Sequence, residues 1–170
     1  DLTVTAENSA DSASIADFKR QKRYRLMWMG TKYEPGTVKV VAYNEKGDAV
    51  AEKEIHTAGK PDHIELVADR NEIKADGKDL SFVTVRVVDK EGNLCPDAQH
   101  LIKYAVKGAG TYRAGANGDP TSLELFHVPQ MKVFNGMMTA VVQSTDKPGE
   151  ITLTATGKGL KSGRLVLMSK

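Results

Sequence analysis

The residues best suited to hydrolytic chemistry in this sequence are its carboxylates, because glycoside hydrolysis needs two of them facing each other across a cleft. Most acidic residues fall in predicted turns or at strand ends, among them Glu45, Asp48, Asp89, Glu91 and Asp97. None lies in a segment rich in Trp, His and Asn. We therefore interpret these carboxylates as solvated turn charges and predict no catalytic residue in this chain.

Nucleophilic and zinc chemistry are also poorly supported. No two histidines lie two or four residues apart, and none neighbours the single cysteine, Cys95, so the short ligand spacing of a zinc site is missing. Pro96 follows Cys95 in a turn, and we predict a small, partly buried thiol there. Ser162-Gly163 lacks the first glycine of a nucleophile elbow. The four histidines are His56, His63, His100 and His127.

Calcium is the metal that the sequence leaves open. Oxygen-bearing residues lie in or near several turns, and such loops on β-sandwiches can hold Ca²⁺. No Asp-x-Asp-x-Asp-Gly run is present, however, so we predict no metal ion and no cofactor, with a calcium site as the alternative. The residues concerned are Asp69, Asp76, Asp79, Asp89 and Asn93.

Aromatic rings that could stack on a sugar gather at one place, where Trp28 lies near Tyr24 and Tyr33. These three are the candidates for glycan contact. Trp28 occupies the core-facing phase of its predicted strand, which favours burial over sugar binding. The basic run 19–25 precedes it, but the net charge of the chain is only +2. That balance disfavours nucleic acid as a partner, and we interpret the run as a solvated lead-in to a strand.

The elements that would position these residues are predicted to be strands throughout. Apolar residues alternate with polar ones in short runs separated by Gly, Pro and Asn turns, and no run has the period of a helix. Runs spaced by roughly 8–12 residues are typical of an antiparallel β-sandwich. No uninterrupted apolar run exceeds four residues, so no membrane-spanning segment is predicted. The predicted strands are 24–28, 38–42, 50–57, 63–68, 80–89, 101–106, 137–144, 151–156 and 165–168, whereas glycines break up 107–122.

A short polar segment with Gly59 and Pro61 predicts a domain boundary near residue 60. Residues 1–59 would form a partial immunoglobulin-like module and residues 60–170 a complete immunoglobulin-like sandwich. Segments 37–41 and 84–88 resemble each other, and each leads into a hairpin turn. We interpret this internal similarity as a sign of two related modules in tandem.

Several motifs resemble a known family in the right order. The first module resembles the immunoglobulin-like module that follows the catalytic barrel in many Bacteroidetes β-galactosidases of glycoside hydrolase family 2, and the second is similar to the C-terminal module of the same enzymes. The first resemblance rests on Arg25-Leu26-Met27-Trp28, on 33–43 and on Thr57-Ala58-Gly59. The second rests on Leu66-x-Ala68-Asp69-Arg70, 75–80, 87–93, Asn117-Gly118-Asp119-Pro120-Thr121-Ser122, Phe134-Asn135-Gly136 and Val142-Gln143-Ser144.

The resemblance implies a non-catalytic region of a secreted enzyme. Both catalytic glutamates would belong to the upstream barrel, which these modules would brace while aiding contacts with substrate or subunits. It also implies a periplasmic or extracellular location. The opening hairpin of the first module is missing from residues 1–18, so that module is expected to be incomplete. The second module also resembles the repeats of invasins and intimins, which gives the alternative of an adhesin-like spacer or a carbohydrate-binding module.

Overall fold

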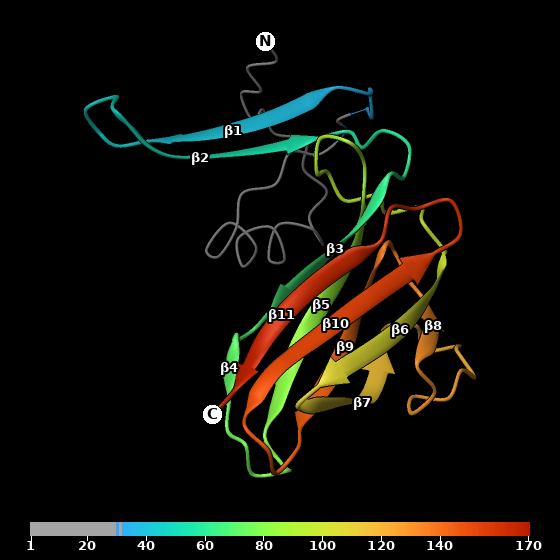
Figure 1. The fold of residues 1–170 in the computed structure, drawn as a ribbon. Helices are drawn as coiled ribbons and strands as arrows, with labels where there is room; N and C mark the ends of the chain where they lie inside the picture. Colours follow the sequence, from blue (N-terminus) through green and yellow to red (C-terminus); the bar gives the residue numbers. More distant parts are fainter. Residues whose placement is uncertain (1–29, 31) are drawn as a thin grey trace, which may run out of the picture. The chain divides into compact units, whose positions relative to one another are not determined.

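The structure, a computed structural model, describes residue 30 and residues 32–170. Those residues form eleven strands and no helix, which confirms the predicted all-β class (Figure 1). The chain divides into two units, residues 1–36 and residues 37–170, and every described strand belongs to the second. No helix in the described part of the chain is long and apolar enough to cross a membrane.

The first two strands form a hairpin. β1 (Thr37–Tyr43) pairs antiparallel with β2 (Ala49–His56). Asn44 builds the turn, because its Oδ1 accepts hydrogen bonds from the amides of Lys46 and Asp48, both at 2.9 Å. The hairpin confirms the predicted strands 38–42 and 50–57, whereas the predicted strand 24–28 lies outside the described residues.

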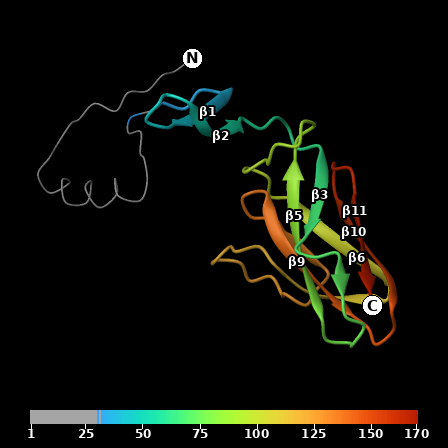
Figure 2. The same ribbon diagram turned by 90° about the vertical axis from the view of Figure 1, so that its left-hand side faces the viewer.

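The remaining strands form two facing sheets (Figure 2). All pairings are antiparallel except that of β4 with β11. The four-stranded sheet has the order β3 (His63–Ala68), β5 (Leu80–Val88), β9 (Met137–Ser144), β7 (Gly110–Ala116). The five-stranded sheet has the order β4 (Glu72–Ile73), β11 (Gly163–Ser169), β10 (Gly149–Gly157), β6 (Leu101–Gly108), β8 (Gln130–Lys132).

The core between the sheets follows from strict alternation along the central strands. In β5, Val83, Val85 and Val87 are fully buried and alternate with residues on the outer face. In β10, Ile151 and Leu153 face them and are also fully buried. Each such side chain contributes roughly 1.5–3 kcal/mol when it leaves water. The sandwich thus has an apolar core of its own.

Two aromatic rings stack at the core of the sandwich, one within it and one packed against it. The rings of Tyr104 and Tyr112 stack at a centroid distance of 5.6 Å. The Tyr104 hydroxyl donates a hydrogen bond to Met138 Sδ at 2.7 Å, and burial raises the pKa of Tyr104 well above its usual range. This tyrosine is therefore a neutral structural group.

Three strands were missed by the sequence analysis. β4 and β8 contain two and three residues, too few for alternation to be visible. β7 lies inside the glycine-rich stretch that we interpreted as broken up. At its start, a Cβ on Gly110 would press against the Ile151 side chain, so glycine marks close packing there and not a loop. The domain boundary near residue 60 stays a prediction.

Candidate functional site

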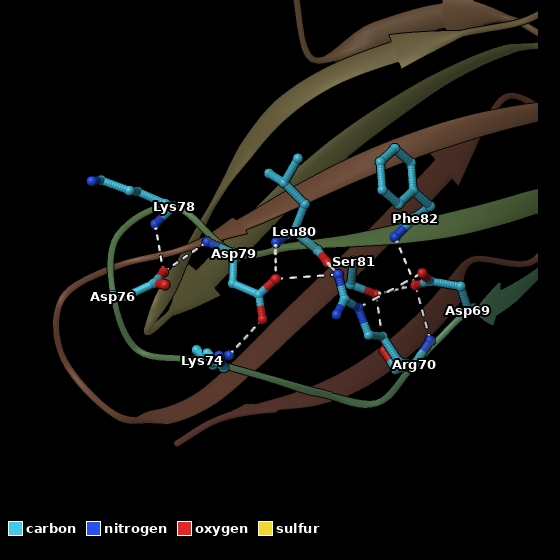
Figure 3. Close-up of polar contacts among 9 residues, drawn as sticks. All are labelled: Asp69, Arg70, Lys74, Asp76, Lys78, Asp79, Leu80, Ser81 and Phe82. Atoms are coloured by element: carbon cyan, nitrogen blue, oxygen red, sulfur yellow. Dashed lines mark hydrogen bonds and ion pairs between the residues drawn. The ribbon is translucent and has the colours of Figure 1, made fainter.

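Polar side chains gather where the chain turns from β3 into β5 (Figure 3). Asp69 Oδ1 accepts hydrogen bonds from the Phe82 amide at 2.8 Å and from the Ser81 hydroxyl at 3.1 Å. It also accepts one from the amide of Arg70 at 2.9 Å. The Ser81 side chain is fully buried. One oxygen of Asp69 thus accepts three hydrogen bonds, and two of them tie the end of β3 to the start of β5.

Arg70 joins this edge to the next carboxylate. Its Nη2 donates to the Leu80 carbonyl at 2.6 Å and lies 3.2 Å from Asp79 Oδ1. Asp79 Oδ2 accepts a hydrogen bond from the Lys74 amide at 2.8 Å, and this bond is the main cause that lowers the pKa of Asp79. Asp79 is thus held ionised by donors and is unsuited to act as a general acid.

The third carboxylate of this group, Asp76, caps its own turn. Its Oδ1 accepts hydrogen bonds from the amides of Lys78 and Asp79, both at 2.8 Å, and these lower its pKa. The turn is anchored to the other strands by Gln143, whose side-chain amide donates to the Gly77 carbonyl at 2.6 Å. The three carboxylates therefore lock one end of the sandwich.

A fourth carboxylate, Asp89, lies after the last residue of β5. Our interpretation of it as a solvated turn charge was wrong, because Asp89 is 1% exposed. Its Oδ2 accepts hydrogen bonds from the Gly59 amide at 2.7 Å and the Asn93 side chain at 3.1 Å. Its Oδ1 accepts from the amides of Glu91 at 3.0 Å and Asn93 at 2.8 Å. Sequence spacing does not show the Gly59 bond, because thirty residues separate the two partners.

These bonds explain the acidity of Asp89. Its pKa is lowered to about 2, first by the Gly59 amide and then by the donors of its own turn, against the opposing effect of burial. A carboxylate that is charged at neutral pH thus ties the segment before β3 to the turn after β5. Asp62 reinforces the tie, because its amide donates to the Val88 carbonyl at 2.8 Å. Its carboxylate lies 2.9 Å from Lys161 Nζ.

The predicted partly buried thiol is confirmed. Cys95 is 4% exposed, and burial raises its pKa. A thiol that stays protonated and hidden from solvent is a poor nucleophile. Gly136 packs against it, with a left-handed backbone (φ 73°) that leaves no room for a Cβ beside the Cys95 carbonyl oxygen. Cys95 is therefore a structural residue.

The candidate metal ligands do not converge. Asp69, Asp76 and Asp79 lie before or at the start of β5, whereas Asp89 and Asn93 follow its end. A strand of nine residues separates the two sets by roughly 30 Å. Among the described residues, no three His, Cys, Asp or Glu side chains gather in a way that could hold a metal ion.

The predicted glycan-contact residues are only partly visible. Trp28 and Tyr24 lie outside the described residues. Tyr33 is 77% exposed. Their role in glycan contact stays a prediction.

The segment 117–129, which we call the β7–β8 loop, stands out from the sandwich beside β8 (Figure 1). Asp119 Oδ1 accepts hydrogen bonds from the hydroxyl and the amide of Thr121, at 2.7 and 2.8 Å. The Thr121 hydroxyl is the main cause of the lowered pKa of Asp119. Asn117 Oδ1 accepts from the Asp119 amide, and Asn117 Nδ2 donates to the Lys132 carbonyl, both at 3.0 Å. The loop is thus ordered by its own side chains.

The second half of the β7–β8 loop is held by the neighbouring strands. The Gly115 amide donates to the Phe126 carbonyl at 2.8 Å, and the Lys132 amide donates to the Glu124 carboxylate at 3.2 Å. Despite these anchors, the loop leaves Leu123, Leu125 and Phe126 exposed. This exposure was not predicted from the sequence, although residues 123–126 contain three apolar residues outside any predicted strand.

Two family models match the chain. Glycoside hydrolase family 2 C-terminal domain 5 matches residues 64–166. A domain of unknown function (DUF4982) matches residues 6–51.

Individual proteins agree with the first match. A β-galactosidase of Bacteroides ovatus, BoGH2A, is 50% identical over 139 residues, which cover 82% of this chain and 16% of that protein. A β-galactosidase of Thermoanaerobacter pseudethanolicus is 38% identical over 109 residues, covering 64% of this chain and 13% of that protein. The solved structure of a glycosyl hydrolase family 2 member from Bacteroides cellulosilyticus superposes with a TM-score of 0.77 at 35% identity, covering 82% of this chain and 18% of that one. The chain therefore spans about one sixth of the length of its relatives.

Proposed function

The chain belongs to the glycoside hydrolase family 2 C-terminal domain 5 family, and from this membership we propose that it is the non-catalytic C-terminal region of a β-galactosidase. The observation that carries the proposal is the 50% identity to a β-galactosidase over most of this chain but only 16% of the relative. In this proposal the remaining part of the enzyme performs the hydrolysis.

The state of the carboxylates supports a non-catalytic role. A retaining or inverting glycosidase needs one carboxyl group that donates a proton and a second that attacks or activates water. Asp76, Asp79 and Asp89 instead accept backbone hydrogen bonds that keep their pKa values low. Their positions serve the turns, so these groups support structure and not proton transfer.

The finer part of the proposal concerns what the region does for the enzyme. We expect the sandwich to brace the catalytic barrel, and to aid contacts with substrate or with other subunits. The tie between Gly59 and Asp89 supports this role, because it fixes the chain where it enters the sandwich. We further propose that the enzyme is exported to the periplasm or the cell exterior.

Turnover of a nitrophenyl β-galactoside tests the proposal. The 170-residue chain should release no nitrophenol above the rate in buffer, whereas the whole gene product should turn the substrate over. Turnover by the chain alone, or a gene product without a glycosidase domain, would overturn it. Fractionation of the native cells tests the location, and an enzyme retained in the cytoplasm would contradict export.

A further inference from the structure

The β7–β8 loop carries an unusual amount of exposed apolar surface. Leu123 is 96% exposed, Leu125 61% and Phe126 62%. Single exposed apolar side chains are common on protein surfaces, but three large ones within four residues form a patch, and such patches mark interaction sites. Nothing in the described fold covers them.

The loop holds this patch in a defined geometry. Asp119 and Asn117 fold its first half, and the Phe126 carbonyl is anchored to β7 by the Gly115 amide. A loop that is ordered before binding loses little conformational entropy when a partner covers it. The patch is therefore suited to docking against a fixed surface.

The charges of the loop are already used internally. The Glu124 carboxylate, between the two leucines, accepts a hydrogen bond from the Lys132 amide. The Asp119 carboxylate is occupied by Thr121. The loop thus offers aliphatic and aromatic carbon, and its partner must present an apolar surface.

We infer that the β7–β8 loop docks into an apolar groove on the catalytic part of the same polypeptide, an inference that rests on the proposed function. The segment matched by this chain makes up 16% of BoGH2A and 18% of the solved Bacteroides cellulosilyticus protein, so a body about five times larger is attached to it in those proteins. Covalent attachment makes such a contact intramolecular, with an effective concentration that a separate partner does not reach. For such an intramolecular contact, a patch of three side chains is sufficient to hold the loop against its partner surface.

Two other occupants fit the patch less well. A stable dimer buries roughly 800 Å² on each partner, far more than three side chains provide. A sugar would be bound by planar rings together with free hydrogen-bonding groups. The patch offers one ring, that of Phe126, and the carboxylates of the loop are already hydrogen-bonded within the chain. The experiment below distinguishes a second copy of the chain and a sugar from the intramolecular partner.

Hydrogen exchange tests the docking directly. Within residues 32–170 the amides of Leu125 and Phe126 donate no hydrogen bond, so in the 170-residue chain they should exchange rapidly. In the whole gene product we expect exchange of residues 123–127 to be roughly tenfold slower, with no dependence on protein concentration. Equal exchange rates in the two proteins would overturn the inference.

A matched pair of variants separates docking from general surface effects. Leu123→Ser with Phe126→Ser should remove the slowed exchange in the whole gene product and shorten its activity half-life at elevated temperature several-fold. Val67→Ser with Phe82→Ser changes two side chains that are 49% and 46% exposed on the sandwich itself, and should do neither. Equal effects of both pairs would contradict a specific role for the loop.

The other outcomes are distinguishable. Slow exchange that appears only at high concentration, together with a dimer in sedimentation, would assign the patch to a second copy and overturn the inference. Slow exchange that requires added galacto-oligosaccharide would assign it to sugar and overturn it as well. A gene product that lacks galactosidase activity but still protects the loop would contradict the proposed function, while the docking itself would stand.

Discussion

The β1–β2 hairpin and the sandwich of β3–β11 use the same alternation of β-branched and polar residues, but only the sandwich buries its apolar side chains. Val38 and Ile55 of the hairpin are 60% and 64% exposed, whereas Val85 and Leu153 of the sandwich are fully buried. The central sandwich strands each have two neighbours and a facing sheet. Alternation therefore predicts a strand, and burial depends on a second sheet.

Local polar contacts hold the hairpin. Lys39 Nζ lies 2.9 Å from Glu52, Thr37 Oγ1 lies 2.9 Å from His56 Nδ1, and Asn44 caps the turn. Among the described strands, β1 and β2 pair only with each other, and a two-stranded hairpin by itself is marginally stable in water. We therefore expect the hairpin to open at a lower free energy than the sandwich.

The largest expected contrast comes from removing one apolar side chain in each region. Leu153→Ala should lower the free energy of unfolding of the sandwich by roughly 2–5 kcal/mol, because it leaves a cavity in the core. Ile55→Ala should change it by less than about 0.5 kcal/mol, since the side chain is already in water. Urea denaturation of the 170-residue chain measures both. Similar losses would show that the hairpin is part of the same cooperative unit.

A second contrast uses two glycines with left-handed backbones. Gly136 (φ 73°) lies against the Cys95 carbonyl, whereas Gly47 (φ 85°) has open space where a Cβ would lie. Gly136→Ala should destabilise the sandwich by roughly 3 kcal/mol, because strain and collision add. Gly47→Ala should speed amide exchange in the hairpin and leave the sandwich's urea midpoint unchanged. A lowered midpoint for Gly47→Ala would contradict independent opening.

Much of this fold was predictable because its signals are local. The alternation of apolar and polar residues along 80–89 predicted β5, and the segment 37–41 predicted a hairpin turn after it. The motifs quoted in order along the chain also predicted the family, which the family model confirms over residues 64–166. These features depend on residues adjacent in sequence or on motifs with fixed spacing.

Features that depend on distant partners were not predictable. The burial of Asp89 follows from the Gly59 amide, and the role of Gly110 follows from the approach of Ile151 on another strand. The exposure of Leu123 could not be predicted either. A run of apolar residues does not show whether other parts of the fold cover it. Such properties appear only after the sheets have paired.

The third contrast concerns acid. The pKa of Asp89 is about 2 when folded and about 3.9 when unfolded, so its stabilising effect is complete above pH 4 and is lost as the pH falls toward 2. Asp89→Asn should therefore lower the sandwich's urea midpoint at pH 6 and flatten its decline between pH 4 and 2. The urea midpoint of this variant should still fall somewhat with falling pH, because other carboxylates also have lowered pKa values. These are Asp62, Asp76, Asp79 and Asp119. Asp48→Asn in the hairpin turn is the control, and an equal flattening there would contradict a specific role for Asp89.

The smallest expected effect lies in the hairpin's ion pair. Lys39 of β1 pairs in register with Glu54 and reaches Glu52 of β2 diagonally. The side chains of Lys39 and Glu52 are 47% and 66% exposed, so water and salt screen their attraction. Replacing both with alanine should leave the urea midpoint of the sandwich unchanged, and should speed exchange of the β1 and β2 amides at low salt only. At 1 M salt the variant and the original chain should exchange alike, because the Debye length falls to about 3 Å. A difference that persists at high salt would mean that the two side chains stabilise the hairpin by packing, and that the exposed hairpin depends less on electrostatics than its contacts indicate.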